Sequence, residues 1–271
     1  AAFRSVDAVE EVLSLYRPHS QVSELNRTGR LDHPHPWLVE VLEEATHLSR
    51  RTKGAFDITV QPLWSVYDAA NKAGRLPEPA VLEAALAKVG WERVVLEPGR
   101  VRLQGRGTQI TLNGLAQGHA ADVMAAELAR RGVRHALVDS GEISGLGTRP
   151  GADFWSIGIK HPRQEGACLG VTELNGRSLA TSGDYQTRFG TGYRNHHLVD
   201  PRTGHSPGDW SSVSVAAPSA FQADALSTAA FLLDRRQALQ LVRDTPGADA
   251  LFIDKDGRTF ATEGFPFHAS A

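Results

Sequence analysis

Apolar residues recur at helical spacing in several stretches of this chain. Residues 7–16 begin at Asp7, a plausible N-cap, and end before Pro18, which predicts a helix. Residues 36–53 predict a clearer one, with a proline in the first turn, a continuous apolar face and a glycine just past the end. The same spacing predicts helices over residues 79–89, 115–131, 219–233 and 235–243.

Elsewhere the hydrophobic pattern has a period of two, which is typical of strands. Residues 94–96 and 101–103 flank a turn at residues 97–100 and predict a hairpin. Further strands are predicted over residues 110–112, 135–139, 155–160, 169–174, 196–199, 212–217 and 250–254. Because the strands come in hairpin-like groups separated by isolated helices, we expect an α+β fold with largely antiparallel sheets and flanking helices. No repeat or linker marks a boundary, so we expect a single domain over residues 1–271.

Composition narrows the class of protein. The 271 residues suffice for a substantial core, and the net charge of −2 implies no bulk attraction to nucleic acid or to anionic membranes, so we expect no nucleic-acid partner. The single cysteine, Cys168, excludes an internal disulfide and a cysteine metal cluster. No apolar run reaches the roughly 18 residues of a membrane-spanning helix, so we expect no transmembrane segment.

A carboxylate and a hydroxyl lie four residues apart in the predicted helix over residues 219–233. Asp224 and Thr228 therefore share one face of that helix. Together they offer Mg²⁺ two oxygen ligands and leave coordination positions open for phosphate or water. The pair alone is also typical of a threonine bonded to the carbonyl of the preceding turn and an aspartate serving the helix dipole.

Other blocks upstream carry candidate chemistry. Residues 113–118 follow a predicted strand and open a helix, which offers backbone N–H groups to a phosphate, although a tight strand-to-helix turn needs the same glycines. Residues 138–147 form a Gly-rich turn that allows close approach to a flat ligand, or a plain surface hairpin. Residues 181–185 (Thr-Ser-Gly-Asp-Tyr) precede residues 195–204, whose His–Asp pair makes His197 a candidate general base rather than only a packed strand residue.

The order and spacing of these blocks resemble the ApbE family of FAD:protein FMN transferases. The resemblance extends from Tyr16 to Thr228 and includes residues 20–26 and 54–63. It implies a fold related to the T-fold, FAD as substrate and Mg²⁺ as cofactor. It further implies transfer of FMN from FAD to a Thr or Ser hydroxyl in the flavinylation motif of a partner flavoprotein, with release of AMP.

The resemblance also implies roles for individual residues. The metal ligands would be Asp224, Thr228 and the carbonyl of Ala116. The base that activates the acceptor hydroxyl would be His197, with Asp184 as the second candidate. The implied flavin-nucleotide contacts, besides His197, are Ser23, Leu25, Asn26, Phe56, Asp57, Asn113, Gly114, Gln117, Gly118, Ser140, Gly141, Glu142, Thr181, Ser182 and Gly183.

Several positions depart from the family pattern. Thr111, Asn113 and Gln117 stand where the family usually has Asp, Gly and Lys, and Ser140 replaces a glycine. Gln117 exchanges a point cation near the diphosphate for an amide that still donates hydrogen bonds. This variant resembles the branch associated with nitrous oxide reduction. Two alternatives stay open, namely an FAD diphosphatase that yields FMN and AMP, and a non-enzymatic FAD-binding or flavin-delivery protein.

The resemblance also sets an expectation for the location of the protein. The family works mostly outside the cytoplasm, so we expect a periplasmic or other extracytoplasmic protein whose signal or lipid anchor lies outside this sequence. In the family the first strand carries a Met-Gly-Thr element, which does not occur before Asp7. We therefore expect part of that strand to be truncated or altered.

Overall fold

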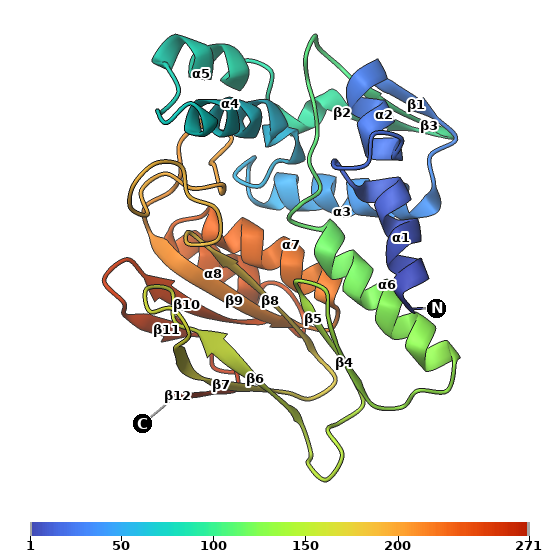
Figure 1. Cartoon of the computed structure of the whole chain (residues 1–271), viewed down its shortest axis with the longest axis vertical. Coiled ribbons are helices and arrows are strands. Elements are labelled where there is room, and N and C mark those ends of the chain that lie inside the picture. Colours follow the sequence, from blue (N-terminus) through green and yellow to red (C-terminus); the bar gives the residue numbers. More distant parts are fainter. Residues whose placement is uncertain (1, 270–271) are drawn as a thin grey trace. The chain divides into compact units, whose positions relative to one another are not determined.

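The computed structural model describes residues 2–269 of the chain (Figure 1). These residues divide into two compact units. Unit 1 is built from residues 2–6, 117–185 and 208–269, and unit 2 from residues 7–116 and 186–207. The prediction of a single domain over the whole chain stays a prediction.

Unit 1 contains a six-stranded antiparallel sheet with the strand order β11-β10-β9-β8-β5-β4. Its strands are β4 (Ala136–Asp139), β5 (Ile143–Leu146), β8 (Ser178–Gly183), β9 (Trp210–Ala217), β10 (Asp249–Asp254) and β11 (Thr259–Ala261). Every residue of β9 is buried, as expected for an inner strand covered on both faces.

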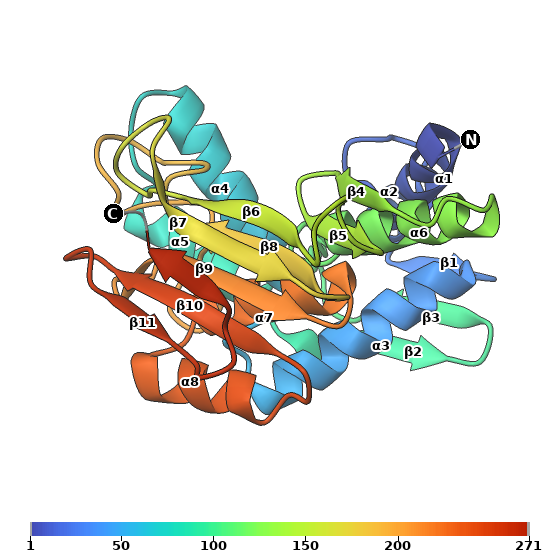
Figure 2. The same cartoon turned by 90° about the horizontal axis from the view of Figure 1, so that it is seen from below.

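A smaller antiparallel sheet of unit 1 has the order β12-β7-β6 and packs on the large sheet. Its strands are β6 (Trp155–Lys160), β7 (Cys168–Leu174) and β12 (Phe267–Ala269). Ile157 and Ile159 of β6 pack in one cluster with Leu179 of β8 and Leu251 of β10. Figure 2 shows α7 (Ala220–Phe231) and α8 (Arg235–Arg243) on the opposite side of the large sheet.

The helix α6 (Ala116–Arg130) packs beside the start of α7. Its Ala121 forms a small buried cluster with Val138 of β4 and Ala220 of α7. Small side chains allow the two helices to approach closely, so the first turns of α6 and α7 lie against each other.

Unit 2 combines helices with a three-stranded antiparallel sheet of order β1-β3-β2. Ser20 caps α2 by accepting a hydrogen bond from the backbone of Ser23, and Gly29 ends that helix at φ 71°. Tyr67 and Phe189 stack in its core, with ring centroids 5.1 Å apart. The remaining elements of the described chain are α1 (Ala2–Leu13), α2 (Gln21–Thr28), β1 (Arg30–Asp32), α3 (Pro36–Arg51), η1 (Ile58–Val60), α4 (Gln61–Lys72), α5 (Pro79–Leu86), η2 (Trp91–Arg93), β2 (Val94–Glu97) and β3 (Arg100–Leu103).

The predicted α+β fold with largely antiparallel sheets is confirmed. The predicted hairpin at residues 94–103 forms as β2 and β3, and the predicted helices over residues 36–53, 115–131 and 219–233 form within a few residues of their expected ends. The pattern missed two helices and five strands, namely α2, α4, β1, β5, β8, β11 and β12. Among the described residues, no helix is long and apolar enough to cross a membrane.

Two predicted strands were wrong. At residues 110–112 the side-chain amide of Asn26 takes the place of a neighbouring strand, since it accepts from the N–H of Ile110 at 2.7 Å and donates to the carbonyl of Ile110 at 2.8 Å. Residues 196–199 lie in a loop in which only an isolated bridge pairs His196 with Arg188. The apolar side chains of both segments are buried in the core although neither segment joins a sheet.

Candidate active site

Four segments of unit 1 bring predicted site residues together. They are the start of α6, the turn between β4 and β5, the end of β8, and the face of α7 that carries Asp224 and Thr228. The predicted residues that they contribute with mutual contacts are Gln117, Gly118, Ser140, Gly141, Glu142, Thr181, Ser182, Asp224 and Thr228. Residues more than 100 positions apart in sequence thus form one polar cluster within this unit.

Asp224 is held in place by the backbone of α6. Its side chain is 3% exposed, and its Oδ2 accepts a hydrogen bond from the N–H of Gly118 at 3.0 Å. A Cβ on Gly118 would lie 2.2 Å from the carbonyl oxygen of Ala220 and 2.8 Å from the Cβ of Asp224. Only glycine therefore allows α6 to approach α7 this closely.

Thr228 follows Asp224 by one helical turn, as the sequence spacing predicts. Its hydroxyl lies 3.2 Å from the hydroxyl of Ser182 at the end of β8, and Ser182 also bonds Ser227 at 2.9 Å. Ser227 in turn donates to the carbonyl of Asp224 at 3.1 Å. The hydroxyl chain around Asp224 therefore includes Ser227, which the sequence analysis did not single out.

The turn between β4 and β5 lies against Gln117. Gly141 has φ 102°, and a Cβ there would lie 2.5 Å from Nε2 of Gln117. The hydroxyl of Ser140 donates to the carbonyl of Gln117 at 3.4 Å. The strands β4 and β5 thus form a hairpin whose turn packs directly on the first turn of α6, and its approach to a flat ligand stays a prediction.

Two buried carboxylates interact in this cluster. Glu142, 8% exposed, accepts from the backbone of Thr181 at 3.2 Å. Burial raises the pKa of Glu142, and the negative charge of Asp224 raises it further. Burial likewise raises the pKa of Asp224, against the opposing effect of the Gly118 N–H.

This electrostatic arrangement suits a cation. Within the described part of the chain, neither Glu142 nor Asp224 forms an ion pair. A divalent ion would supply the missing positive charge, and the carboxylate and hydroxyl of α7 are oxygen ligands of the kind that Mg²⁺ prefers. No group of three His, Cys, Asp or Glu side chains among residues 2–269 could hold a metal, but the predicted ligand set draws only one member, Asp224, from those types.

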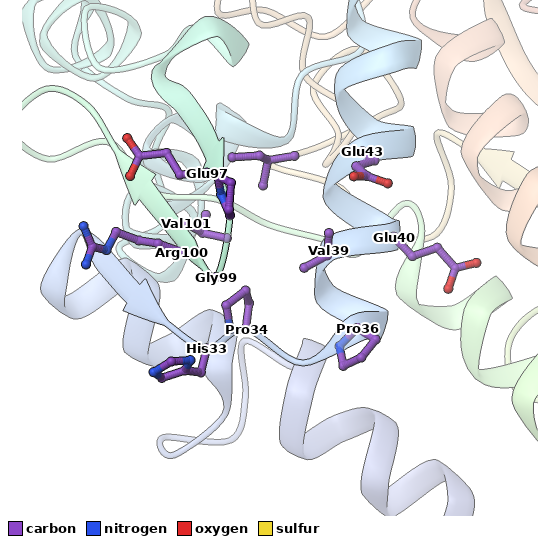
Figure 3. Close-up of a pocket in the computed structure, with 12 residues that line it drawn as sticks. His33, Pro34, Pro36, Val39, Glu40, Glu43, Glu97, Gly99, Arg100 and Val101 are labelled. Atoms are coloured by element: carbon purple, nitrogen blue, oxygen red, sulfur yellow. The ribbon is translucent and has the colours of Figure 1, made fainter.

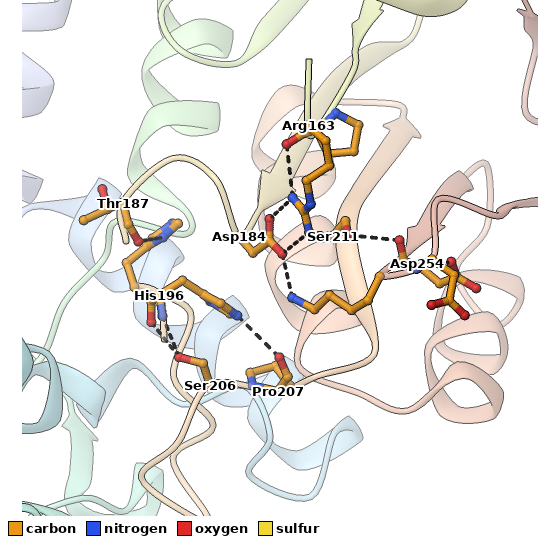
Figure 4. A network of polar contacts seen from close by, with 12 residues as sticks. Arg163, Asp184, Thr187, His196, Ser206, Pro207, Ser211 and Asp254 are labelled. Carbon is orange, nitrogen blue, oxygen red and sulfur yellow. Dashed lines mark hydrogen bonds and ion pairs between the residues drawn. The ribbon is translucent and has the colours of Figure 1, made fainter. Parts of the chain in front are cut away.

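Asp184 has a different environment from the one expected of a base. Its side chain is fully buried, and Arg163 donates to both carboxylate oxygens at 2.7 Å (Figure 4). Lys255 donates to Oδ2 at 2.6 Å, and Arg163 also reaches the hydroxyl of Ser211 at 2.6 Å. A carboxylate neutralised by two cations is a poor proton acceptor, so this geometry argues against Asp184 as the second candidate base. The sequence analysis missed both cations, which come from loops far from Asp184 in the chain.

Gly183 ends β8 in unit 1, and unit 2 holds the remaining predicted residues. The backbone N–H of His197 donates to the carbonyl of Thr187 at 3.0 Å, and its Nδ1 lies 3.3 Å from the same oxygen. The carboxylate of Asp200 bonds Arg202, with Oδ1 accepting from Nε at 2.9 Å, so the predicted His–Asp pair is not formed by Asp200. Figure 4 also shows the neighbouring His196, whose backbone N–H donates to Ser206 at 2.9 Å.

The predicted flavin-contact residues of unit 2 differ in how deeply they are buried. Asp57 caps η1, and burial raises its pKa to about 6 although Thr59 donates to it. Leu25 is fully buried and Phe56 is 4% exposed, so their side chains pack in the core, and their contact with a ligand stays a prediction. The predicted residues with surface or loop positions are Ser23, Asn26, Asn113, Gly114 and Ala116, of which Asn113 donates to the Tyr16 hydroxyl at 3.2 Å.

A separate groove lies in unit 2, with a volume of about 860 Å³ (Figure 3). It is formed by the start of α3, the β2–β3 hairpin and the loop between β1 and α3. Val39 and Val101 line it beside Pro34. None of the predicted site residues belongs to this lining, so the groove is not part of the candidate site.

The sequence model of the ApbE family matches residues 1–252, which is most of the chain. The chain belongs to the ApbE family. It is 32% identical over 286 residues to the FAD:protein FMN transferase of Treponema pallidum, covering 97% of this chain and 78% of that protein. It is 30% identical over 272 residues to the FAD:protein FMN transferase of Salmonella typhimurium, covering 95% of this chain and 77% of that protein.

Solved structures of ApbE proteins share the fold. The crystal structure of the ApbE protein from Thermotoga maritima superposes with a TM-score of 0.88 at 27% identity, covering 97% of this chain and 87% of that one. The flavin transferase ApbE from Vibrio cholerae gives a TM-score of 0.86 at 26% identity, covering 98% and 89%. The resemblance drawn from the sequence blocks is thereby confirmed.

Proposed function

We infer that this ApbE-family chain is an FAD:protein FMN transferase. In this reaction the phosphoanhydride bond of FAD breaks, the FMN phosphorus forms a new bond to a Thr or Ser oxygen of a partner protein, and AMP leaves with the bridging oxygen. The observation that carries the inference is the cluster in which Gly118 at the start of α6 holds Asp224 beside Thr228 and Ser182. Phosphoryl transfer depends mainly on positioning and on charge neutralisation, which this cluster can provide.

We propose that the cluster binds Mg²⁺ through the Asp224 carboxylate, the Thr228 hydroxyl and the carbonyl of Ala116. A divalent ion held by these residues would supply positive charge to offset the charge of the diphosphate during phosphoryl transfer. The buried carboxylates of Glu142 and Asp224, which lack a cationic partner among residues 2–269, support this assignment. Gln117, packed against the turn at Gly141, is the residue we assign to hydrogen-bonding near the diphosphate.

His197 is the base that we propose for the acceptor hydroxyl. Its ring belongs to a loop rather than to a strand, and its Nδ1 lies 3.3 Å from the carbonyl oxygen of Thr187. An imidazole titrates near neutral pH and can take the proton that leaves the acceptor oxygen. Asp184, enclosed by Arg163 and Lys255, is better suited to stabilising the structure.

We also propose an extracytoplasmic location and an acceptor flavoprotein linked to nitrous oxide reduction. The location rests on the family resemblance, and the link to nitrous oxide reduction rests on the variant block at residues 113–118. The acceptor would present a Thr or Ser in its flavinylation motif.

The transferase assignment is tested by incubating the protein with FAD, MgCl₂ and a candidate acceptor domain, then following covalent flavin by in-gel fluorescence and intact mass. We expect a flavin-linked acceptor that is absent with EDTA and absent with Asp224→Ala. Intact FAD bound under every condition would overturn the assignment and favour a flavin carrier.

A further inference from the structure

A second carboxylate joins α6 to α7, one helical turn beyond the contact between Gly118 and Asp224. Asp122 of α6 accepts hydrogen bonds from the backbone N–H groups of Ala220 and Phe221, both at 2.9 Å. Ala220 and Phe221 are the first two residues of α7. Asp122 therefore holds the start of the helix that carries Asp224.

The two contacts act on matching faces of the helices. Gly118 and Asp122 are four residues apart on α6, and Ala220 and Asp224 are four residues apart on α7, so each pair lies on one side of its helix. Gly118 meets Asp224, and Asp122 meets Ala220. The strands β8 and β9 hold one side of α7, and the two contacts fix its position against α6 at two points one helical turn apart.

The bonds made by Asp122 are not needed to form α7. Ser219 already caps this helix by accepting from the backbone of Gln222 at 3.1 Å. Asp122 is separated by 98 residues from Ala220, so its contribution concerns where the helix lies and not whether it forms locally. The carboxylate also complements the positive end of the α7 dipole.

Asp122 is tied to the hairpin turn as well. Ser144 of β5 donates to Oδ1 of Asp122 at 3.3 Å, and Ser178 of β8 lies 3.4 Å from the Ser144 hydroxyl. Ser144 stands two residues after Glu142. The same carboxylate thus connects α6, α7 and the strand that follows Glu142.

We propose that Asp122 is a positioning residue that fixes the register of α7 on α6 and thereby places Asp224 and Thr228 for a divalent cation. The proposal rests on the proposed function for the identity of that cation's site. Asp122 acts through the backbone of α7 and is not itself assigned a contact with the substrate. Outer residues that orient metal ligands typically contribute about 10- to 100-fold to metal affinity.

The test compares Asp122→Asn with Asp234→Asn. Asp234 caps α8 by accepting from the backbone of Gln237 at 2.9 Å, so both variants remove a carboxylate from a helix N-terminus. Only Asp122 contacts the helix that carries Asp224. The buried cluster of Ala121, Val138 and Ala220 stays in place, which favours folding of the Asp122→Asn variant.

Two quantities are measured for each protein. One is Mn²⁺ binding, followed by the loss of the free-ion EPR signal, and the other is the Mg²⁺ concentration that half-saturates flavin transfer. For Asp122→Asn we expect the affinity for Mn²⁺ to fall, and the half-saturating Mg²⁺ concentration to rise, by about tenfold or more. The rate of flavin transfer at saturating Mg²⁺ should change less. For Asp234→Asn we expect the wild-type values.

Wild-type metal binding in Asp122→Asn, or equal weakening in Asp234→Asn, would overturn the positioning role. If Asp122→Asn does not fold, Ser144→Ala decides the question, because it removes one donor to Asp122, and unchanged Mn²⁺ binding there counts against the proposal. If the wild-type protein binds Mn²⁺ but transfers no flavin, the proposed function fails while the comparison of Mn²⁺ affinities still tests Asp122.

Discussion

The backbone N–H of Gly118 donates a hydrogen bond to Oδ2 of Asp224 at 3.0 Å and joins two helices that are 106 residues apart in sequence. The contact is possible because position 118 has no Cβ, which would otherwise lie 2.2 Å from the carbonyl oxygen of Ala220. The absence of a side chain at position 118 of α6 thus allows the backbone to hold the Asp224 side chain of α7.

Gly118→Ala tests this contact. The helix propensity gain of about 1 kcal/mol is outweighed by overpacking, so we expect the free energy of unfolding to fall by about 2 kcal/mol or more and flavin transfer to be lost. Urea unfolding and covalent flavin formation measure the two effects. Gly208→Ala is the control, since a Cβ there has no heavy atom within 4 Å. A Gly118→Ala variant as stable and active as the control would contradict the described packing of α6 on α7.

We expect the free energy of unfolding to depend on pH through Asp57. Burial raises its pKa from 3.8 to about 6, so the folded protein binds this proton more tightly than the unfolded chain does. Its contribution to the free energy of unfolding is therefore largest at low pH, falls as pH rises from about 4 to about 6, and is lost above that range, a change of ~3 kcal/mol. The difference in unfolding free energy between wild type and Asp57→Asn, measured by urea titration across this range, should show that change. A difference that does not vary with pH would contradict the assignment.

Asp184 is expected to affect stability and not proton transfer. Its removal leaves Arg163 and Lys255 without their carboxylate partner, and breaking a buried ion pair from one side costs about 3–5 kcal/mol. Asp184→Asn should therefore unfold at lower urea concentration, while the pH dependence of flavin transfer by the folded fraction keeps its wild-type shape. A changed pH profile at unchanged stability would restore Asp184 as a candidate base.

His197 is expected to show the opposite behaviour. If it accepts the proton of the acceptor hydroxyl, His197→Gln should lower the rate of flavin transfer about 10²- to 10⁴-fold. The unfolding midpoint should change little, since the ring is only half-buried. A rate within a few-fold of the wild type would remove His197 from the reaction.

Short-range features of this site could be predicted from the sequence. The spacing of Asp224 and Thr228 predicted a shared helical face, and the structure confirms that both lie on α7. The block at residues 113–118 predicted the start of a helix, and α6 begins within it at Ala116. These features depend on helix periodicity and on backbone geometry, which a few neighbouring residues determine.

Features that depend on distant partners could not be predicted. Asp184 looked like a candidate base because nothing in its own block indicates the bonds to Arg163 and Lys255, which lie 21 and 71 residues away. The strand predicted at residues 110–112 failed for the same reason, because its partner is the side chain of Asn26, 84 residues upstream.

The central claim is tested most directly by the stoichiometry of products. The protein is incubated with FAD and MgCl₂, with and without an acceptor domain, and AMP, free FMN and covalent FMN are quantified by chromatography and intact mass. We predict one AMP for each covalent FMN, with neither product formed without acceptor or with EDTA. AMP and free FMN in equal amounts without acceptor would instead identify an FAD diphosphatase and contradict the transferase assignment.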